Sequence, residues 1–173
     1  MTKKFSTTPS VWLNHAHFLA NTLSQPDAAR ALLPRALRSL PSHAHIPVTS
    51  KFGALEFHSP SGDPERGRTV FEGLLSTFPK RWDLWGVLID LEIGRLKGLE
   101  GKEDHTEGIE GVRRLFTRVL GSKGLKDKTA RSFFRRWIVF EQGLGSQGQV
   151  EVVKKKAGDW VRKRAEKKAD EGS

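Results

Sequence analysis

Histidines are the first side chains in this sequence that could do chemistry, because they occur in close pairs. The pairs are His15-x-His17 and His43-x-His45. Residues two apart on a helix point in different directions, so neither pair forms a ready metal site. We interpret these histidines as surface or packing residues, and the sequence predicts no bound metal.

A glycine pattern could indicate a nucleotide site. Gly143, Gly145 and Gly148 spell G-x-G-x-x-G, which binds dinucleotides where it follows a strand and opens a helix. Here it follows a predicted helix, so we interpret it as a turn between helices. The sequence has no cysteine, which excludes disulfides, thiolate metal sites and cysteine nucleophiles. With no P-loop, nucleophile elbow or carboxylate dyad, the sequence predicts a protein that is not an enzyme and takes no cofactor or small-molecule substrate.

Basic residues are the strongest functional signal. The chain has 30 Lys and Arg against 20 Asp and Glu, for a net charge of +10, which favours an acidic partner, nucleic acid first among them. The excess gathers in the C-terminal half, and the candidate contacts with RNA or an acidic partner are Arg113, Arg114, Arg118, Lys123, Lys126, Lys128, Arg131, Arg135, Arg136, Lys154, Lys155, Lys156, Arg162, Lys163 and Arg164. Acidic residues interleave with them, so a solvated surface is the alternative. Any contact with RNA is expected to be driven by charge.

An internal repeat in the sequence indicates the fold that positions these side chains. An aromatic residue is followed six and seven positions later by an apolar residue and a glutamate, in copies that start at Trp85 and Phe134. Weaker copies start at Trp12 and Thr49, so the first three copies are spaced by about 37 residues. A period of 20–50 residues is typical of a solenoid of stacked helical units.

Helical periodicity supports the same fold. Apolar residues return at steps of three and four along most of the chain, and strand signals are absent. Asp63-Pro64 is a strong helix start, and Leu-x-x-apolar-Pro ends two helices, at Pro41 and Pro79. The sequence predicts eight or nine helices in antiparallel pairs, a kink at Pro34 and an exposed insertion over residues 98–108.

The glutamates of the repeat are unusual because they adjoin apolar runs. A partly buried carboxylate needs a cationic partner, and we predict that Glu56 pairs with Arg68 and Glu92 with Arg113; solvated glutamates are the alternative. The aromatics are expected to fill the gap between the helices of a pair, which removes most of them as RNA-stacking platforms. The residues predicted to define the packing of the repeats are Trp12, Phe18, Leu55, Glu56, Arg68, Phe71, Pro79, Trp85, Leu91, Glu92, Arg113, Phe116, Phe134, Phe140 and Glu141.

These motifs together resemble a known repeat. An aromatic-x5-apolar-Glu helix followed by Arg-x-x-apolar and Leu-x-x-apolar-Pro resembles the half-a-TPR, or HAT, repeat. More narrowly, residues 52–57, 67–72 and 79–85 resemble the C-terminal region of a family of large ribosomal-RNA-processing proteins whose N-terminal part is a string of S1 RNA-binding domains. Thr49 in place of the aromatic, Leu19 in place of the glutamate and the missing proline after Leu120 depart from the pattern. They leave the repeat register open in those copies.

The resemblance implies an all-α, right-handed α-α superhelix of about four helix pairs. It covers residues 10–165, between a disordered or artificial start over 1–9 and a charged flexible tail over 166–173. It also implies a non-catalytic scaffold of the nucleolus or nucleus that docks other ribosome assembly factors in pre-rRNA processing and small-subunit (processome) assembly, with a basic flank near pre-rRNA. The alternatives are an interaction module of messenger-RNA splicing or 3′-end formation, a direct RNA-binding helical repeat, and a self-associating scaffold. No apolar run approaches the roughly 20 residues of a membrane span, so no membrane partner is expected.

Overall fold

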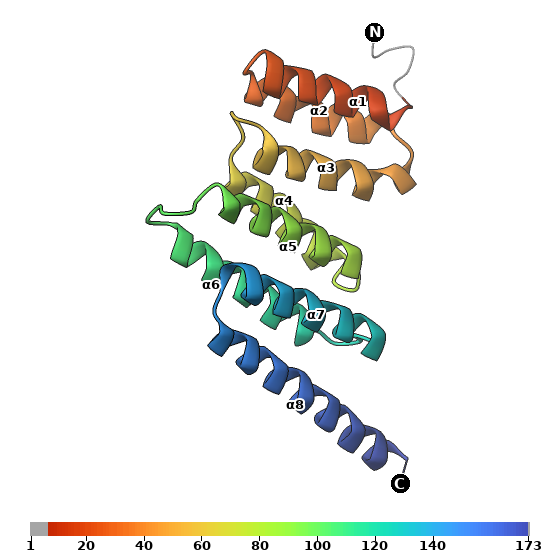
Figure 1. The fold of residues 1–173 in the computed structure, drawn as a ribbon. Coiled ribbons are helices and arrows are strands. Elements are labelled where there is room, and N and C mark those ends of the chain that lie inside the picture. The colour runs from red at the N-terminus through yellow and green to blue at the C-terminus, as the bar shows by residue number, and fades with distance from the viewer. Residues whose placement is uncertain (1–6, 173) are drawn as a thin grey trace. The chain divides into compact units, whose positions relative to one another are not determined.

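The computed structural model describes residues 7–172, and its helices follow one another in consecutive packed pairs (Figure 1). In chain order the α-helices are α1 (Pro9–His17), α2 (Pro26–Ser39), α3 (His45–His58), α4 (Pro64–Thr77), α5 (Trp82–Lys97), α6 (His105–Leu120), α7 (Asp127–Leu144) and α8 (Gln147–Glu171). A π-helical turn (Phe18–Thr22) extends α1, and a 3-10 turn (Ser42–Ala44) precedes α3. No strand occurs in residues 7–172. The predicted all-α solenoid class is therefore confirmed, whereas its handedness stays a prediction.

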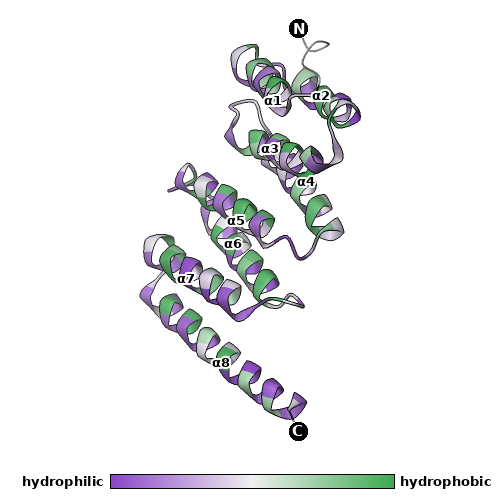
Figure 2. Cartoon of the chain, turned by 90° about the vertical axis from the view of Figure 1, so that its right-hand side faces the viewer, coloured by the Kyte–Doolittle hydropathy of each residue, from purple (hydrophilic) through white to green (hydrophobic). Residues whose placement is uncertain are grey.

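The chain forms two compact units, Met1–Leu91 and Glu92–Ser173. In the first, α1 packs against α2 and α3 packs against α4. Its buried core includes Trp12, Ala16, Leu32, Val48 and Phe52, which lie at the three- and four-residue steps of helices with one apolar face. Because one side of a helix faces the core and the other faces solvent, hydrophobic and hydrophilic residues alternate along the helices (Figure 2).

Two glycines let α3 and α4 approach closely. A Cβ atom at Gly67 would lie 2.5 Å from Cε2 of Phe57 and 2.9 Å from the carbonyl oxygen of Gly53. A Cβ atom at Gly53 would lie 3.0 Å from the ring of Phe71. The pair therefore depends on the absence of side chains at this crossing.

The second unit is built on aromatic rings between its helices. Phe116 of α6 stacks on Trp137 of α7, with ring centroids 5.4 Å apart and planes 4° from parallel. The ring of Phe140 also packs against Phe116, with ring centroids 6.2 Å apart. Val150 and Val153 of α8 are fully buried, so α8 closes the core against α7.

Four local features of the chain can be compared with expectation. Helix α2 continues through Pro34 to Ser39, and Pro34 lies on its exposed side, where the carbonyl that loses its donor can be hydrated. Helix α6 already begins at His105, inside the predicted insertion. Residues 166–171, predicted as a flexible tail, continue α8, and Pro9, predicted in a disordered start, begins α1. Residues 1–6 and 173 lie outside the described part of the chain. No described helix is long and apolar enough to cross a membrane.

Replacing Gly67 by alanine is expected to destabilise the first unit. The new methyl group would collide with Phe57 and the backbone of α3, and overpacking of this kind costs about 1–3 kcal/mol. Gly73→Ala in the same helix is the matched control, because nothing lies within 4 Å of its Cβ position, and alanine there should add about 0.5–1 kcal/mol. Urea unfolding of both variants measures the difference; equal free energies of unfolding would contradict the close crossing.

Candidate functional site

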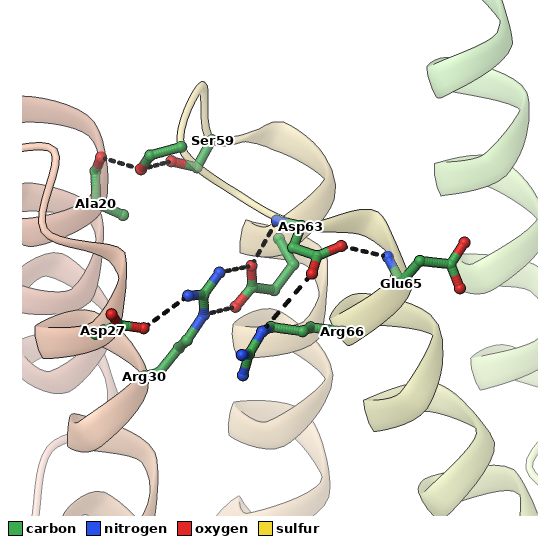
Figure 3. A network of polar contacts seen from close by, with 9 residues as sticks. Ala20, Asp27, Arg30, Ser59, Asp63, Glu65 and Arg66 are labelled. Atoms are coloured by element: carbon green, nitrogen blue, oxygen red, sulfur yellow. Dashed lines mark hydrogen bonds and ion pairs between the residues drawn. The ribbon is translucent and has the colours of Figure 1, made fainter.

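A partly buried ion pair joins the two helix pairs of the first unit. Arg30 of α2 donates from Nε to Oε1 of Glu56 at 2.7 Å and from Nη2 to Oε2 at 2.9 Å. The same Glu56 oxygen Oε2 accepts from the backbone amide of Asp63 at 2.8 Å, and Arg30 also donates from Nη1 to Asp27 at 2.9 Å (Figure 3). One carboxylate of α3 therefore ties the second helix of the first pair to the turn before α4.

The charges of this pair shift each other's titration. Burial by itself would raise the pKa of Glu56, but the hydrogen bonds from Arg30 and from the Asp63 amide outweigh it and hold the pKa below its usual range. The hydrogen bond to Glu56 raises the pKa of Arg30. Both groups therefore stay charged in the folded protein.

Further polar contacts extend this network to α1 and α4 (Figure 3). Asp63 accepts from the backbone amide of Glu65 at 3.0 Å and so caps α4. Ser61 donates to the carbonyl oxygen of Ala20 at 3.0 Å, which belongs to the π-helical turn after α1. Four consecutive helices thus meet around the Arg30–Glu56 pair.

The second unit repeats this arrangement. Arg113 of α6 donates from Nε and Nη2 to the two carboxylate oxygens of Glu141 on α7, each at 2.8 Å. The indole Nε1 of Trp137 donates to Oε1 of Glu141 at 3.1 Å, and the side chain of Glu141 has no exposed surface. The hydrogen bond to Glu141 raises the pKa of Arg113, which also pairs with Glu110.

Both predicted pairings are therefore wrong. The carboxylate of Glu56 is bound by Arg30 instead of Arg68, and Arg113 binds Glu141 instead of Glu92. In each case the arginine comes from the helix before the glutamate. Neighbouring helices are antiparallel. The end of the first helix of a pair therefore lies near the start of two helices, namely the second helix of the preceding pair and the second helix of its own pair. Spacing in the sequence alone does not choose between them.

A second acid accompanies each arginine, and the sequence analysis missed it. Arg30 pairs with Asp27, Arg113 with Glu110, and Arg68 with Glu65, always three residues earlier. Residues three apart on a helix are neighbours. The pattern acid-x-x-Arg in three second helices was therefore a readable signal.

Most of the predicted packing residues lie in the interior. The buried ones are Trp12, Leu55, Phe71, Trp85, Leu91, Glu92, Phe116, Phe134, Phe140 and Glu141. Phe18 is a correction: half of its surface is exposed. It lies two residues from both Ala16 and Ala20, which are buried, and residues two apart on a helix point in different directions. Pro79 is also exposed, although its carbonyl accepts from the indole of Trp85 at 3.2 Å. Val48, and not Thr49, is fully buried near the start of α3.

The predicted basic residues differ in whether another side chain of the protein already contacts their charge. Acidic side chains pair with Arg113, Arg114, Lys154, Arg162 and Arg164, while Arg136 lies over the ring of Phe133 and Lys156 over that of Trp137. Arg118 is exposed on α6. The exposed residues that form no ion pair within the described part of the chain are Lys123, Lys126, Lys128, Arg131, Arg135, Lys155 and Lys163. Five of these seven lie in the α6–α7 turn and on α7, and those five are called the α7 basic edge below.

A groove of about 180 Å³ lies beside this edge, between the start of α7 and the C-terminal half of α8. Arg164 of α8 lies over the ring of Trp160, 5.6 Å from its centroid, and donates to Asp127 at 3.3 Å. Lys168 donates to the same carboxylate at 3.1 Å, which lowers the pKa of Asp127. Sequence reasoning named Arg131 and Arg164 but missed Trp160 and Lys168. Among residues 7–172, no cluster of three or more His, Asp or Glu side chains could hold a metal ion.

Comparison with known proteins shows what this chain is similar to. It is 44% identical over 161 residues to rRNA biogenesis protein rrp5 of Schizosaccharomyces pombe, which covers 93% of this chain and 9% of that protein. It is 37% identical to the RRP5 homolog of Mus musculus and 36% identical to rRNA biogenesis protein RRP5 of Arabidopsis thaliana, each over 93% of this chain and 8% of the relative. The chain thus spans about a tenth of the length of the relatives that it matches. No protein-family model matches it.

Removing the buried charge of Glu141 is expected to destabilise the second unit strongly. Glu141→Gln leaves the guanidinium of Arg113 without its buried partner, and breaking a buried pair costs about 3 kcal/mol. Glu110→Gln is the matched control, because it removes the exposed partner of the same arginine and should cost less than about 1 kcal/mol. Denaturant unfolding compares the two variants, and similar losses would show that the buried contact is not the one that matters.

Acid is expected to weaken the first unit through Glu56. Its folded-state pKa is lowered, so its contribution is fully present above the unfolded-state value, about 4.3, and is lost as the pH falls through the folded-state value. Glu56→Gln should therefore be less stable than the native chain at pH 7 and should show a shallower loss between about pH 5 and pH 3. Thermal unfolding across this range provides the test; parallel pH profiles would refute the assignment.

Proposed function

We propose that this chain is a segment of an rRNA biogenesis protein, and that it serves there as a non-catalytic scaffold. It would dock other ribosome assembly factors during pre-rRNA processing and small-subunit assembly in the nucleolus. The observation that carries the proposal is the similarity to fungal and plant proteins named for rRNA biogenesis and to a mouse RRP5 homolog, which extends over 93% of the chain.

We assign the helix pairs to the HAT type, in a right-handed superhelix of about four repeats over residues 10–165. The support lies in two ion pairs, Arg30–Glu56 and Arg113–Glu141. Each joins the second helix of one pair to the first helix of the next pair. The acid three residues before each arginine recurs with them. Stacked repeats of this kind offer extended surfaces for partners, and each repeat buries only the faces it shares with its neighbours.

A scaffold agrees with how the polar side chains are used. The carboxylates of Glu56 and Glu141 are bound by arginines and by backbone or indole N–H groups that connect helices, so within residues 7–172 neither of them faces a substrate as an activated group. We therefore propose that binding, and not catalysis, is the role of this segment.

Direct contact with pre-rRNA is the second candidate function. The α7 basic edge (Lys123, Lys126, Lys128, Arg131 and Arg135) supports it, because these charges have no acidic partner in residues 7–172. Exposed cations on one edge attract a phosphate backbone without reading its sequence.

Replacing the matching segment of the fission-yeast relative with this chain tests the proposed function. We expect the chimera to support growth and normal small-subunit rRNA maturation, whereas deletion of the segment should accumulate unprocessed precursors. Northern analysis of pre-rRNA measures both. A chimera that resembles the deletion, or a deletion that disturbs messenger-RNA splicing or 3′-end formation instead, would contradict the proposal.

A further inference from the structure

We propose that the groove between α7 and α8 binds a short peptide segment of a partner protein, in which an apolar side chain lies beside carboxylates. This inference deepens the scaffold role proposed above and relies on it only for the partner being a protein. The walls of the groove, its charge and its size each limit what it can hold.

The walls of the groove are apolar and partly open. Trp160 forms one wall and is held edge-on by Phe134, with ring centroids 6.4 Å apart. Val161 lines the same groove with half of its surface exposed, and Ala165 follows one turn later on α8. A volume of about 180 Å³ lies below the range of ordinary small-molecule sites, roughly 300–1,000 Å³. It suits one apolar side chain inserted from a peptide.

The charged rim selects carboxylates. Arg131, Arg164 and Lys168 face the groove, against the single carboxylate of Asp127. Asp127 already accepts hydrogen bonds from Arg164 and Lys168, so the chain itself shows a carboxylate bound at this position. Arg131 has no ion pair in the described part of the chain, which makes it the first contact for an incoming acid.

A peptide fits this groove better than RNA does. Arg164 lies over the ring of Trp160 and Phe134 meets its edge, so a nucleobase has little free ring surface on which to stack. The groove is a pocket for a single side chain, whereas the α7 basic edge is the longer track of positive charge.

Fluorescence anisotropy with the 173-residue chain tests the proposal. The probe is a fluorescein-labelled peptide of sequence Glu-Glu-Leu-Glu-Glu, with Gln-Gln-Leu-Gln-Gln as the uncharged control peptide. Arg131→Gln should weaken binding of the acidic peptide about fivefold, as expected for a partly exposed ion pair. Arg135→Gln, one turn further along the exposed side of α7 and outside the groove, should change it less than about twofold. Asp127→Asn should tighten binding, because it releases Arg164 and Lys168 for the peptide.

Three outcomes would overturn the proposal. They are absence of binding at low salt, equal weakening by Arg131→Gln and Arg135→Gln, and binding of a ten-nucleotide oligouridylate without binding of the acidic peptide. The last outcome would assign the groove to RNA. Failure here leaves the yeast chimera unaffected, since that experiment reads rRNA maturation and not this groove, so the two proposals fail separately.

Discussion

A carboxylate buried at the end of a helix must be met by a cation, and this requirement governs how successive helix pairs join. Glu56 and Glu141 are each bound by two parallel hydrogen bonds from one guanidinium, a geometry that fixes direction as well as distance. Such pairs add little net stability compared with apolar contacts of the same shape, but a broken one is costly. The apolar core therefore supplies the stability, and the arginine–glutamate pairs select the register in which consecutive pairs stack.

Small and aromatic residues make this burial feasible. A Cβ atom at Gly145 would collide with the carboxylate of Glu141, so glycine at the end of α7 leaves space for the charged group. Trp137 serves two roles, since its ring stacks on Phe116 while its N–H donates to Glu141. The same side chain therefore contacts both the apolar core and the ion pair of the second unit.

Much of the fold could be predicted from the sequence because its signals are local. Helix starts such as Asp63-Pro64 and the three- and four-residue apolar steps depend only on near neighbours. The partner of Glu56 could not be predicted, because α2 and α4 are both neighbours of α3 in chain order and only their packing decides which arginine reaches the carboxylate. Phe18 is not a core residue, because it lies two residues from the buried Ala16 and Ala20 and points in another direction. The end of the chain is rich in charge, which predicts a flexible tail; in the structure it continues α8, and Arg164 and Lys168 pair with Asp127 on α7.

The same ion pairs also distinguish basic residues that hold helices together from basic residues that are open to a partner. An arginine such as Arg113 is part-buried and held by two acids, so its charge is already neutralised and is not available to a partner. Arg131 and Arg135 lie on the same fold with exposed side chains, and neither forms an ion pair within residues 7–172. Net charge alone does not separate these two kinds of arginine, although the acid three residues earlier does: Glu110 precedes Arg113, whereas Lys128 precedes Arg131 and Ser132 precedes Arg135. An acid three residues earlier therefore marks an arginine whose charge is already neutralised, although arginines without it can be paired by an acid elsewhere, as Arg114 and Arg164 are.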